Sequence, residues 1–518
     1  MTSDPSADPG SALLTAVDAD DWAEAVRLLD LHWSVLISTH RAALQEAVNR
    51  LPQEVLVQHP RLVLAAEYLR RLSGAPTTTR FRGAPFPGPP VSLMDALAQL
   101  TSHAAIARAD GRLGEASEAV REARAMLDEA SALAREQLAQ GLPDLQLQWG
   151  LVWEYVGDAD RAVHEYVEAY DSAMVVGNEM VKVTAAASAS FIHALAGRGI
   201  QARIWLDKVP PEGEWWFSRA ALPAVFAATL LLVDEFRLDE ARATLARADL
   251  SQHPERWPFH KLLAAMTVPG PDAAFELLAQ IDGSSAALPD RVTKQGTTGA
   301  VIAVARSILQ SAAGHPAESR ATLNSFEADR DTLAGQTLLC ARAAAEARLG
   351  NYTSASRIVS PLHGHALDAP RTTITVLAVR AASELRAGDT DSAAEQFARA
   401  AALSTTHDSF YALSLLPRED LEQLVARRPD ALPEPIVRRI LDRAQPATID
   451  PFLRLSSKEL EVLAAVLVTD SSADAAARLY VSVNTVKTHL SSIYRKTGVN
   501  SKAALGELAV RFGAHPGV

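Results

Sequence analysis

Apolar residues recur every three or four positions along most of the chain, which is the spacing of one face of an α-helix. Alanine and leucine dominate this pattern, and the alternating runs of valine, isoleucine and threonine that would indicate strands are hard to find. The pattern therefore predicts a protein that is nearly all α-helix. The longest apolar run, residues 220–233, contains Pro223 and is too short for a membrane span, so it predicts a buried helix.

A turn residue followed five positions later by a small residue recurs through the chain. Each such unit predicts a helix that ends in a left-handed residue and a second helix that packs closely through the small residue. A helix pair of this kind cannot bury its apolar face alone, so we expect a solenoid of tetratricopeptide-like repeats over residues 11–430, with a degenerate unit around residues 273–281. The pairs are Asp20/Ala25, Gly111/Ala116, Gly157/Ala162, Gly197/Ala202, Phe236/Ala241, Gly314/Ser319, Gly350/Ala355 and Gly388/Ala393.

Proline, glycine and polar residues mark the boundaries of this solenoid. Residues 1–10 are predicted to be a disordered tail, and the stretch 73–90, rich in Gly, Pro and Thr, an exposed loop. A second proline-rich stretch predicts a linker over residues 431–450. The remaining residues, 451–518, would then form a small separate domain.

Capping residues in this last segment predict a helix-turn-helix. Ser456 and Glu459 have the spacing of a capping box that opens a first helix. A short second helix is expected over residues 471–480. Ser482 is a good N-cap for a longer third helix, which Gly498 can end.

The third helix has two different faces. At helical spacing one stripe is apolar and comprises Val483, Val486, Leu490 and Ile493. The opposite stripe is polar and comprises Asn484, Lys487, Thr488, Ser491 and Arg495. Residues 450–518 hold eight basic and six acidic residues, whereas the rest of the chain holds 42 basic and 56 acidic ones. Positive charge is thus concentrated on the helix whose shape suits a DNA major groove.

This segment closely resembles the LuxR/GerE-type DNA-binding domain. The resemblance is carried by the runs Thr485-Val486-Lys487-Thr488-His489-Leu490-Ser491 and Ile493-Tyr494-Arg495-Lys496. It implies that the third helix reads base edges of double-stranded DNA and that neighbouring cations contact phosphate, so the expected DNA-binding residues are Lys487, Thr488, Ser491, Asn484, Arg495, Lys496 and Lys502. It also implies a homodimer on DNA through the fourth helix, residues 501–512, with contacts at Leu505, Leu508 and Phe512.

Three positions depart from that family pattern. Ala473 stands where the family often has a basic residue, Ala475 where it has a core isoleucine, and Thr469 where it often has glycine. One phosphate contact is therefore missing. This loss leaves an alternative open, in which the chain is a helical-repeat interaction scaffold with a weak or vestigial DNA-binding end.

The repeat region resembles that of MalT-like regulators. The residues that carry this resemblance are Asp21-Trp22, Leu28-Leu29, His32-Trp33, Leu51-Pro52 and Pro60-Arg61-Leu62. It implies that the repeats sense or relay a protein or small-molecule signal. In that family an NTPase module precedes the repeats, and this chain begins about where such a module would end. None of the eight lysines follows a glycine, so we expect no phosphate-binding loop, no ATP and no other cofactor.

The composition of the chain and the lack of catalytic motifs argue against several classes of function. The net charge of −12 argues against a basic protein that coats nucleic acid, and no hydrolase, zinc-protease or dinucleotide motif is found, so an enzyme is not expected. His363 and His365 lack a third ligand, so no metal is expected either. The single cysteine, Cys340, lies in an apolar helix and indicates a core residue in a reducing compartment. Without a signal-peptide pattern, the sequence predicts a cytoplasmic transcriptional regulator with no membrane association.

The role of one aromatic cluster has two possible interpretations. Trp215-Trp216-Phe217 lies beside a predicted loop. The cluster is interpreted either as a core or loop anchor or as a contact for a ligand or partner.

Overall fold

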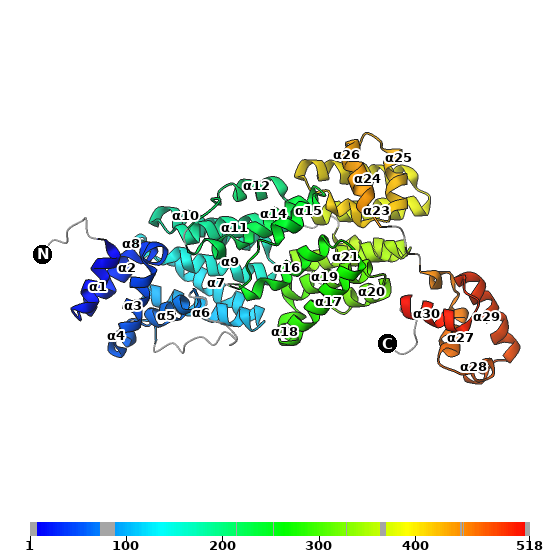
Figure 1. Cartoon of the computed structure of the whole chain (residues 1–518), viewed down its shortest axis with the longest axis horizontal. Helices are drawn as coiled ribbons and strands as arrows, with labels where there is room; N and C mark the ends of the chain where they lie inside the picture. The colour runs from blue at the N-terminus through cyan, green and yellow to red at the C-terminus, as the bar shows by residue number, and fades with distance from the viewer. Residues whose placement is uncertain are drawn as a thin grey trace.

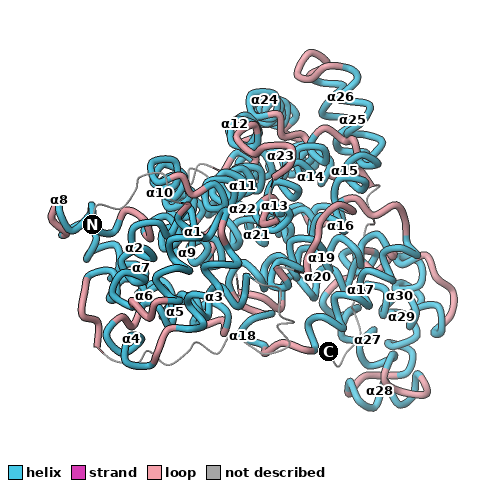
Figure 2. Tube along the Cα trace, turned by 60° about the vertical axis from the view of Figure 1, so that its left-hand side comes forward, coloured by secondary structure: helices cyan, strands magenta, loops and turns pink. Residues whose placement is uncertain are grey.

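The computed structural model describes residues 8–72, 89–213, 215–251, 253–327, 329–362, 369–445, 448 and 450–512. Over these ranges the chain is helical and contains no strand (Figure 2). The helices form an elongated body, with α1 near one end and α27–α30 at the other (Figure 1). The prediction of an all-α protein is therefore confirmed. Most of the loop expected at 73–90, together with His363 and His365, lies outside the described residues.

The first helices form a small bundle with its own core, which includes Leu13, Leu29 and Leu44. Helix α1 begins at Pro9, inside the segment that was predicted to be a disordered tail. The reason is local: the Asp8 side chain caps the helix by accepting the Ser11 N–H, and proline suits the first turn. The bundle comprises α1 (Pro9–Asp18), α2 (Trp22–Thr39), α3 (Arg41–Arg50), α4 (Gln53–Gln58) and α5 (Arg61–Leu72).

Helix pairs then stack along the long axis, and buried side chains run continuously from α6 to α21. The elements are α6 (Leu93–Ala109), α7 (Leu113–Glu129), α8 (Ala132–Leu138), α9 (Leu142–Val156), α10 (Ala159–Val176), α11 (Glu179–Ala196), α12 (Gly199–Leu206), α13 (Phe217–Ala220), α14 (Leu222–Asp234), α15 (Leu238–Leu245), η1 (Pro254–Arg256), α16 (Trp257–Met266), α17 (Pro271–Ala286), α18 (Asp290–Thr293), α19 (Gly296–Ala312), α20 (Pro316–Asn324), α21 (Leu333–Arg348), α22 (Tyr352–Val359), η2 (Ser360–Leu362), α23 (Pro370–Ala387) and α24 (Thr390–His407).

The repeated turns have the geometry that the sequence predicts. All eight turn residues, Asp20 and Phe236 included, have a positive φ between 54° and 95°. Their small partners five positions later are all at most 1% exposed. The left-handed turn and the close packing that follows it are therefore confirmed. Phe236 adopts this conformation without the freedom of glycine, so the packing of its neighbours must hold it there.

The solenoid ends with η3 (Tyr411–Leu415), α25 (Arg418–Arg427) and α26 (Glu434–Arg443). The prediction of a linker over 431–450 is wrong for the residues of α26. Ile440 is buried, and Ile436 and Val437 pack against the same core. Pro435 is compatible with the helix because it lies in the first turn, where no intrahelical N–H bond is lost.

Two features that the sequence singled out belong to the core. Burial raises the pKa of the Cys340 thiol to about 12, as expected of a packed residue and not of a reactive thiol. Trp216 is buried in the N-terminal core, and the Arg41 guanidinium lies 4.0 Å from the centre of the Trp215 ring. Both tryptophans thus hold their segment to the N-terminal bundle, which supports the anchor interpretation. In the described part of the chain no helix is both long and apolar enough to cross a membrane.

Candidate DNA interface

The C-terminal domain is built from η4 (Pro451–Arg454), α27 (Ser457–Leu467), α28 (Ser472–Leu479), α29 (Val483–Thr497) and α30 (Lys502–Phe512). The predicted capping box between Ser456 and Glu459 opens α27. The Ser482 side chain accepts the Thr485 N–H and opens α29, and Gly498, with φ of 77°, ends it. The predicted helix-turn-helix is therefore confirmed in its local details.

Helix α29 packs against α27 and α28 through a narrow apolar stripe. Val486 and Ile493 are fully buried and Leu490 is partly buried. Val483, the first residue of the same apolar stripe, is 38% exposed. The first turn of α29 therefore lies outside the small core, and Val486 is the first residue of this helix that is buried in it.

The opposite face of α29 is open to solvent. All of its predicted contact residues are exposed: Asn484, Lys487, Thr488, Ser491 and Arg495. The Thr488 hydroxyl donates to the Asn484 carbonyl of its own helix, which leaves its oxygen free to accept. Within the described chain, Lys487 and Arg495 make no ion pair. The face thus offers cations and hydroxyls side by side, with no acid among them.

Lys496, also predicted to bind DNA, lies in a different environment. Its Nζ is 2.6 Å from Glu459 Oε2, and the same carboxylate accepts the Ser456 N–H and the Ser492 hydroxyl. These three donors, led by Lys496, lower the pKa of Glu459 to about 2. The lysine therefore ties α29 to the start of α27 and is only 30% exposed.

Lys502, another predicted DNA contact, is not on α29 but is the first residue of α30. Its ammonium donates to the carbonyl oxygen of Thr469, after the end of α27. Its side chain is exposed. Like Lys496, it therefore has a structural partner within the domain.

Two exposed residues beside α29 were not among the predicted contacts. Arg478 lies at the end of α28 with its side chain in solvent. Tyr480 occupies the turn between α28 and α29, is 96% exposed and has a φ of 53°. A large aromatic residue in a left-handed turn is uncommon, and this conformation is visible only in the structure, so no signal in the sequence marked the position.

Comparison with known proteins agrees with this geometry. Residues 453–509 match the model of bacterial regulatory proteins of the luxR family. The C-terminal domain is a LuxR-family helix-turn-helix domain. The oxygen regulatory protein NreC of Staphylococcus aureus, in strains JH9 and JH1, is 41% identical over 64 residues. That match covers 12% of this chain, and the chain spans 30% of the length of these relatives.

The burial of side chains on α30 differs from the expectation that Leu505, Leu508 and Phe512 form a dimer contact. Leu505 and Phe512 are buried in the domain core, whereas Leu508 is only partly buried. The prediction that Leu505 and Phe512 form a dimer contact is therefore wrong for this arrangement. Leu505 packs inside the domain, and the ring of Phe512 lies edge-on to Phe452, 6.4 Å between centroids.

The LuxR-family domain also packs directly against the solenoid. Helix α30 contacts α20, and Arg320 on α20 donates to the Phe512 carbonyl at 3.0 Å. Arg320 also lies 3.7 Å from the Asp450 carboxylate. The side chain of Leu349, just after α21, is part of the domain's own core. The solenoid thus covers one side of α30 and leaves α29 exposed.

Proposed function

We propose that this protein is a DNA-binding transcriptional regulator whose α29 enters the major groove. The observation that carries this proposal is the open polar face of α29, presented on a capped and buried helix-turn-helix. In this proposal Lys487, Thr488 and Ser491 read base edges, assisted by Asn484. Arg495 contacts phosphate, which positions the helix without reading sequence.

The geometry changes which residues we propose as phosphate contacts. Lys496 and Lys502 already have protein partners, so we assign them a weaker role in DNA binding. Arg478 and Tyr480 lie beside the N-terminal half of α29 and have free polar groups. We propose that they supply the backbone contacts that Ala473 cannot make.

We further propose that the protein binds DNA as a homodimer and that the solenoid controls this dimer. Leu508 is the residue of α30 best placed for the contact, since it is apolar and only partly buried. Because α20 lies against α30, a second copy and the solenoid would compete for this helix. An effector on the repeats would release α30 by shifting that balance.

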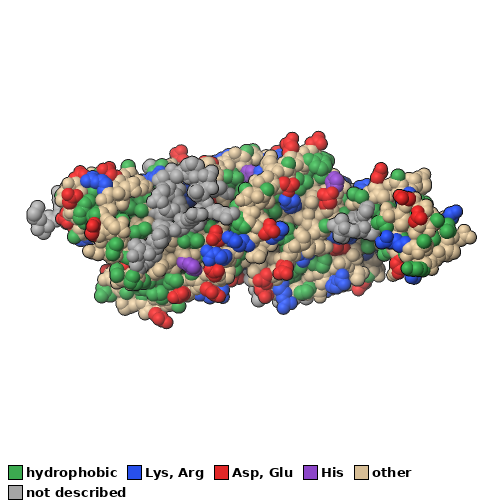
Figure 3. All heavy atoms as spheres, turned by 90° about the horizontal axis from the view of Figure 1, so that it is seen from below, with side chains coloured by type: hydrophobic (Ala, Val, Ile, Leu, Met, Phe, Trp, Pro, Cys, Tyr) green, Lys and Arg blue, Asp and Glu red, His purple; other side chains and the backbone are tan. Residues whose placement is uncertain are grey.

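The distribution of charge supports separate roles for the solenoid and the terminal domain. On the face shown in Figure 3, acidic and basic side chains are interspersed along the body and form no continuous basic surface. Residues outside 450–518 carry a net negative charge, which disfavours DNA along the solenoid. We therefore propose that the repeats take up the signal and that only the terminal domain contacts DNA.

The test is a selection of bound sequences from random DNA, followed by binding of the full chain to single and paired half-sites. We expect an inverted repeat, with cooperative binding that Leu508→Glu abolishes. Val510→Glu is the matched control, because Val510 is exposed and lies about 200° round the same helix. Enrichment of no sequence would overturn the proposal and favour the interaction scaffold. Equal binding to single and paired half-sites would overturn the dimer alone.

A further inference from the structure

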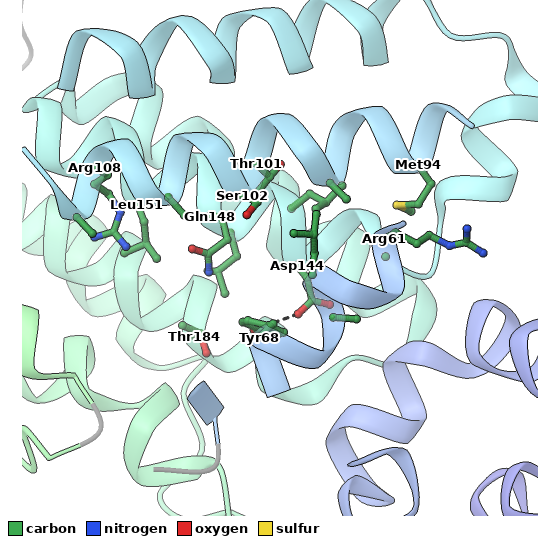
Figure 4. Close-up of a pocket in the computed structure, with 18 of the residues that line it drawn as sticks. Arg61, Tyr68, Met94, Thr101, Ser102, Arg108, Asp144, Gln148, Leu151 and Thr184 are labelled. Atoms are coloured by element: carbon green, nitrogen blue, oxygen red, sulfur yellow. Dashed lines mark hydrogen bonds between the residues drawn. The ribbon is translucent and has the colours of Figure 1, made fainter. Parts of the chain in front are cut away.

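A large groove lies far from the DNA-binding domain, between α5, α6 and α9. Its volume is about 1550 Å³, above the roughly 300–1,000 Å³ of common small-molecule pockets. Segments distant in sequence border it as well, among them η1 and α18. Figure 4 shows side chains from α6 and α9 pointing into the space between these helices and α5.

The groove is long and mostly apolar. Along α6 its lining residues recur every three or four positions from Met94 through Ala98, Ser102 and Ala105 to Arg108. The fourteen helical steps from Met94 to Arg108 span about 21 Å, so the groove runs for roughly that distance. The small side chains of α6 leave the space open, and leucines of α9 form the adjoining wall. An extended apolar molecule fits this shape better than a compact polar one.

Two arginines line this groove without a carboxylate partner. The side chains of Arg108 and Arg219 make no ion pair or hydrogen bond with any residue in the described ranges, and Arg108 Nε is buried from water. The Arg108 guanidinium lies 4.8 Å from the centre of the Tyr155 ring. By contrast, Arg61 in the same lining is paired with Asp30 and Asp95. A buried donor without an acceptor is costly, so an anion at Arg108 would be stabilised.

Glu255, an acidic residue of the groove lining near Arg108, already has a partner in His253. Burial would raise the pKa of the Glu255 carboxyl, but its hydrogen bond with His253 and the charges of His253 and Arg108 hold that pKa below its usual value. The local balance of charge at this end of the groove therefore favours an incoming anion.

Between the two ends of the groove lies a satisfied polar cluster (Figure 4). The Asp144 carboxylate accepts hydrogen bonds from Trp33 Nε1, Tyr68 Oη and Asn178 Nδ2, at 3.2–3.3 Å. Figure 4 shows Asp144 and Tyr68 on the opposite side of Gln148 from Arg108. The Asp144 carboxylate is thus already satisfied, and Arg61 beyond it is paired with Asp30 and Asp95, whereas Arg108 at the other end of α6 has a buried donor for an acidic head.

We propose that this groove binds an amphipathic anion, with its acidic head on Arg108 and its apolar chain between α6 and α9. This inference deepens the effector part of the proposed function and rests on it. It names the ligand as a long-chain molecule with a carboxylate or similar head group. An acidic peptide is the competing occupant that the experiment separates.

The experiment uses full-length protein and two fluorescent probes of similar apolar shape. One is the anion 1-anilinonaphthalene-8-sulfonate, and the other is the neutral N-phenyl-1-naphthylamine. We expect saturable binding of the anion and its displacement by dodecanoate. Arg108→Met should weaken binding of the anion roughly tenfold or more and leave the neutral probe unchanged, because only a charge-assisted contact is lost.

Arg438→Met is the matched control, because this arginine on α26 is exposed and far along the chain. Circular dichroism checks that each variant is folded. Equal affinity of the anion for wild type and Arg108→Met would overturn the proposal. So would displacement by a hexapeptide of leucine and glutamate but not by dodecanoate. DNA binding with and without dodecanoate is measured separately, so a protein that binds the probe but not DNA would refute only the proposed function.

Discussion

Lys487 provides the sharpest test of how α29 meets DNA. Its side chain is exposed and has no ion-pair partner in the described chain, so Lys487→Ala removes no contact that stabilises the fold. Any loss of affinity must therefore come from the complex. We expect the variant to bind its selected site more weakly and to tolerate other bases at the position that Lys487 reads.

The size of this loss depends on how many copies bind. A base-edge contact of this kind contributes about 1–3 kcal/mol to discrimination. A dimer on two half-sites loses the contact twice, so the expected loss is about 2–6 kcal/mol if the half-sites act independently. That corresponds to a weakening of roughly 30-fold to more than 10,000-fold. The loss on unrelated DNA should be much smaller.

The assay is an electrophoretic or fluorescence titration of selected and scrambled DNA at several salt concentrations. Lys458→Ala is the matched control, because Lys458 is an equally charged, 75% exposed lysine on α27 that pairs with Glu461. Arg495→Ala should weaken binding to both DNAs and lower the salt slope by about 2 for a dimer. If Lys487→Ala weakened both DNAs equally and changed only the salt slope, Lys487 would be a phosphate contact and the reasoning would fail.

Three further predictions concern the folded chain. Tyr480→Gly should stabilise the protein by up to about 1 kcal/mol, because glycine adopts the left-handed turn without strain, and a thermal melt would show it. Arg256→Met should cost about 3–5 kcal/mol in denaturant unfolding, since it leaves the Glu154 carboxylate buried without its partner at 2.6 Å, whereas a double variant with Glu154→Leu should recover most of the loss. Because the folded-state pKa of Glu459 is lowered to about 2, its contribution to stability is present above about pH 4.5 and lost as pH falls towards 2. An acid titration of wild type that matched Glu459→Gln throughout would contradict this.

The features that the sequence alone determined follow from local rules. The left-handed turns depend on a residue such as Gly157 or Gly388 and on nearby helix ends, and the caps at Ser456 and Ser482 need only a side chain within three residues. The polar face of α29 likewise follows from helical spacing. Such features are visible in sequence because the interacting groups are near neighbours along the chain.

How separate segments share their surfaces depends on the packing of helices that are distant along the chain. The same apolar stripe on α30 contains the buried Leu505 and the partly buried Leu508, and only the packing around α30 separates them. The partner of Lys496 lies 37 residues away, and Arg108 lines a groove whose other walls come from segments far along the chain. Burial and pairing of this kind depend on which helices meet, so an amphipathic pattern predicts that a face is covered but not what covers it.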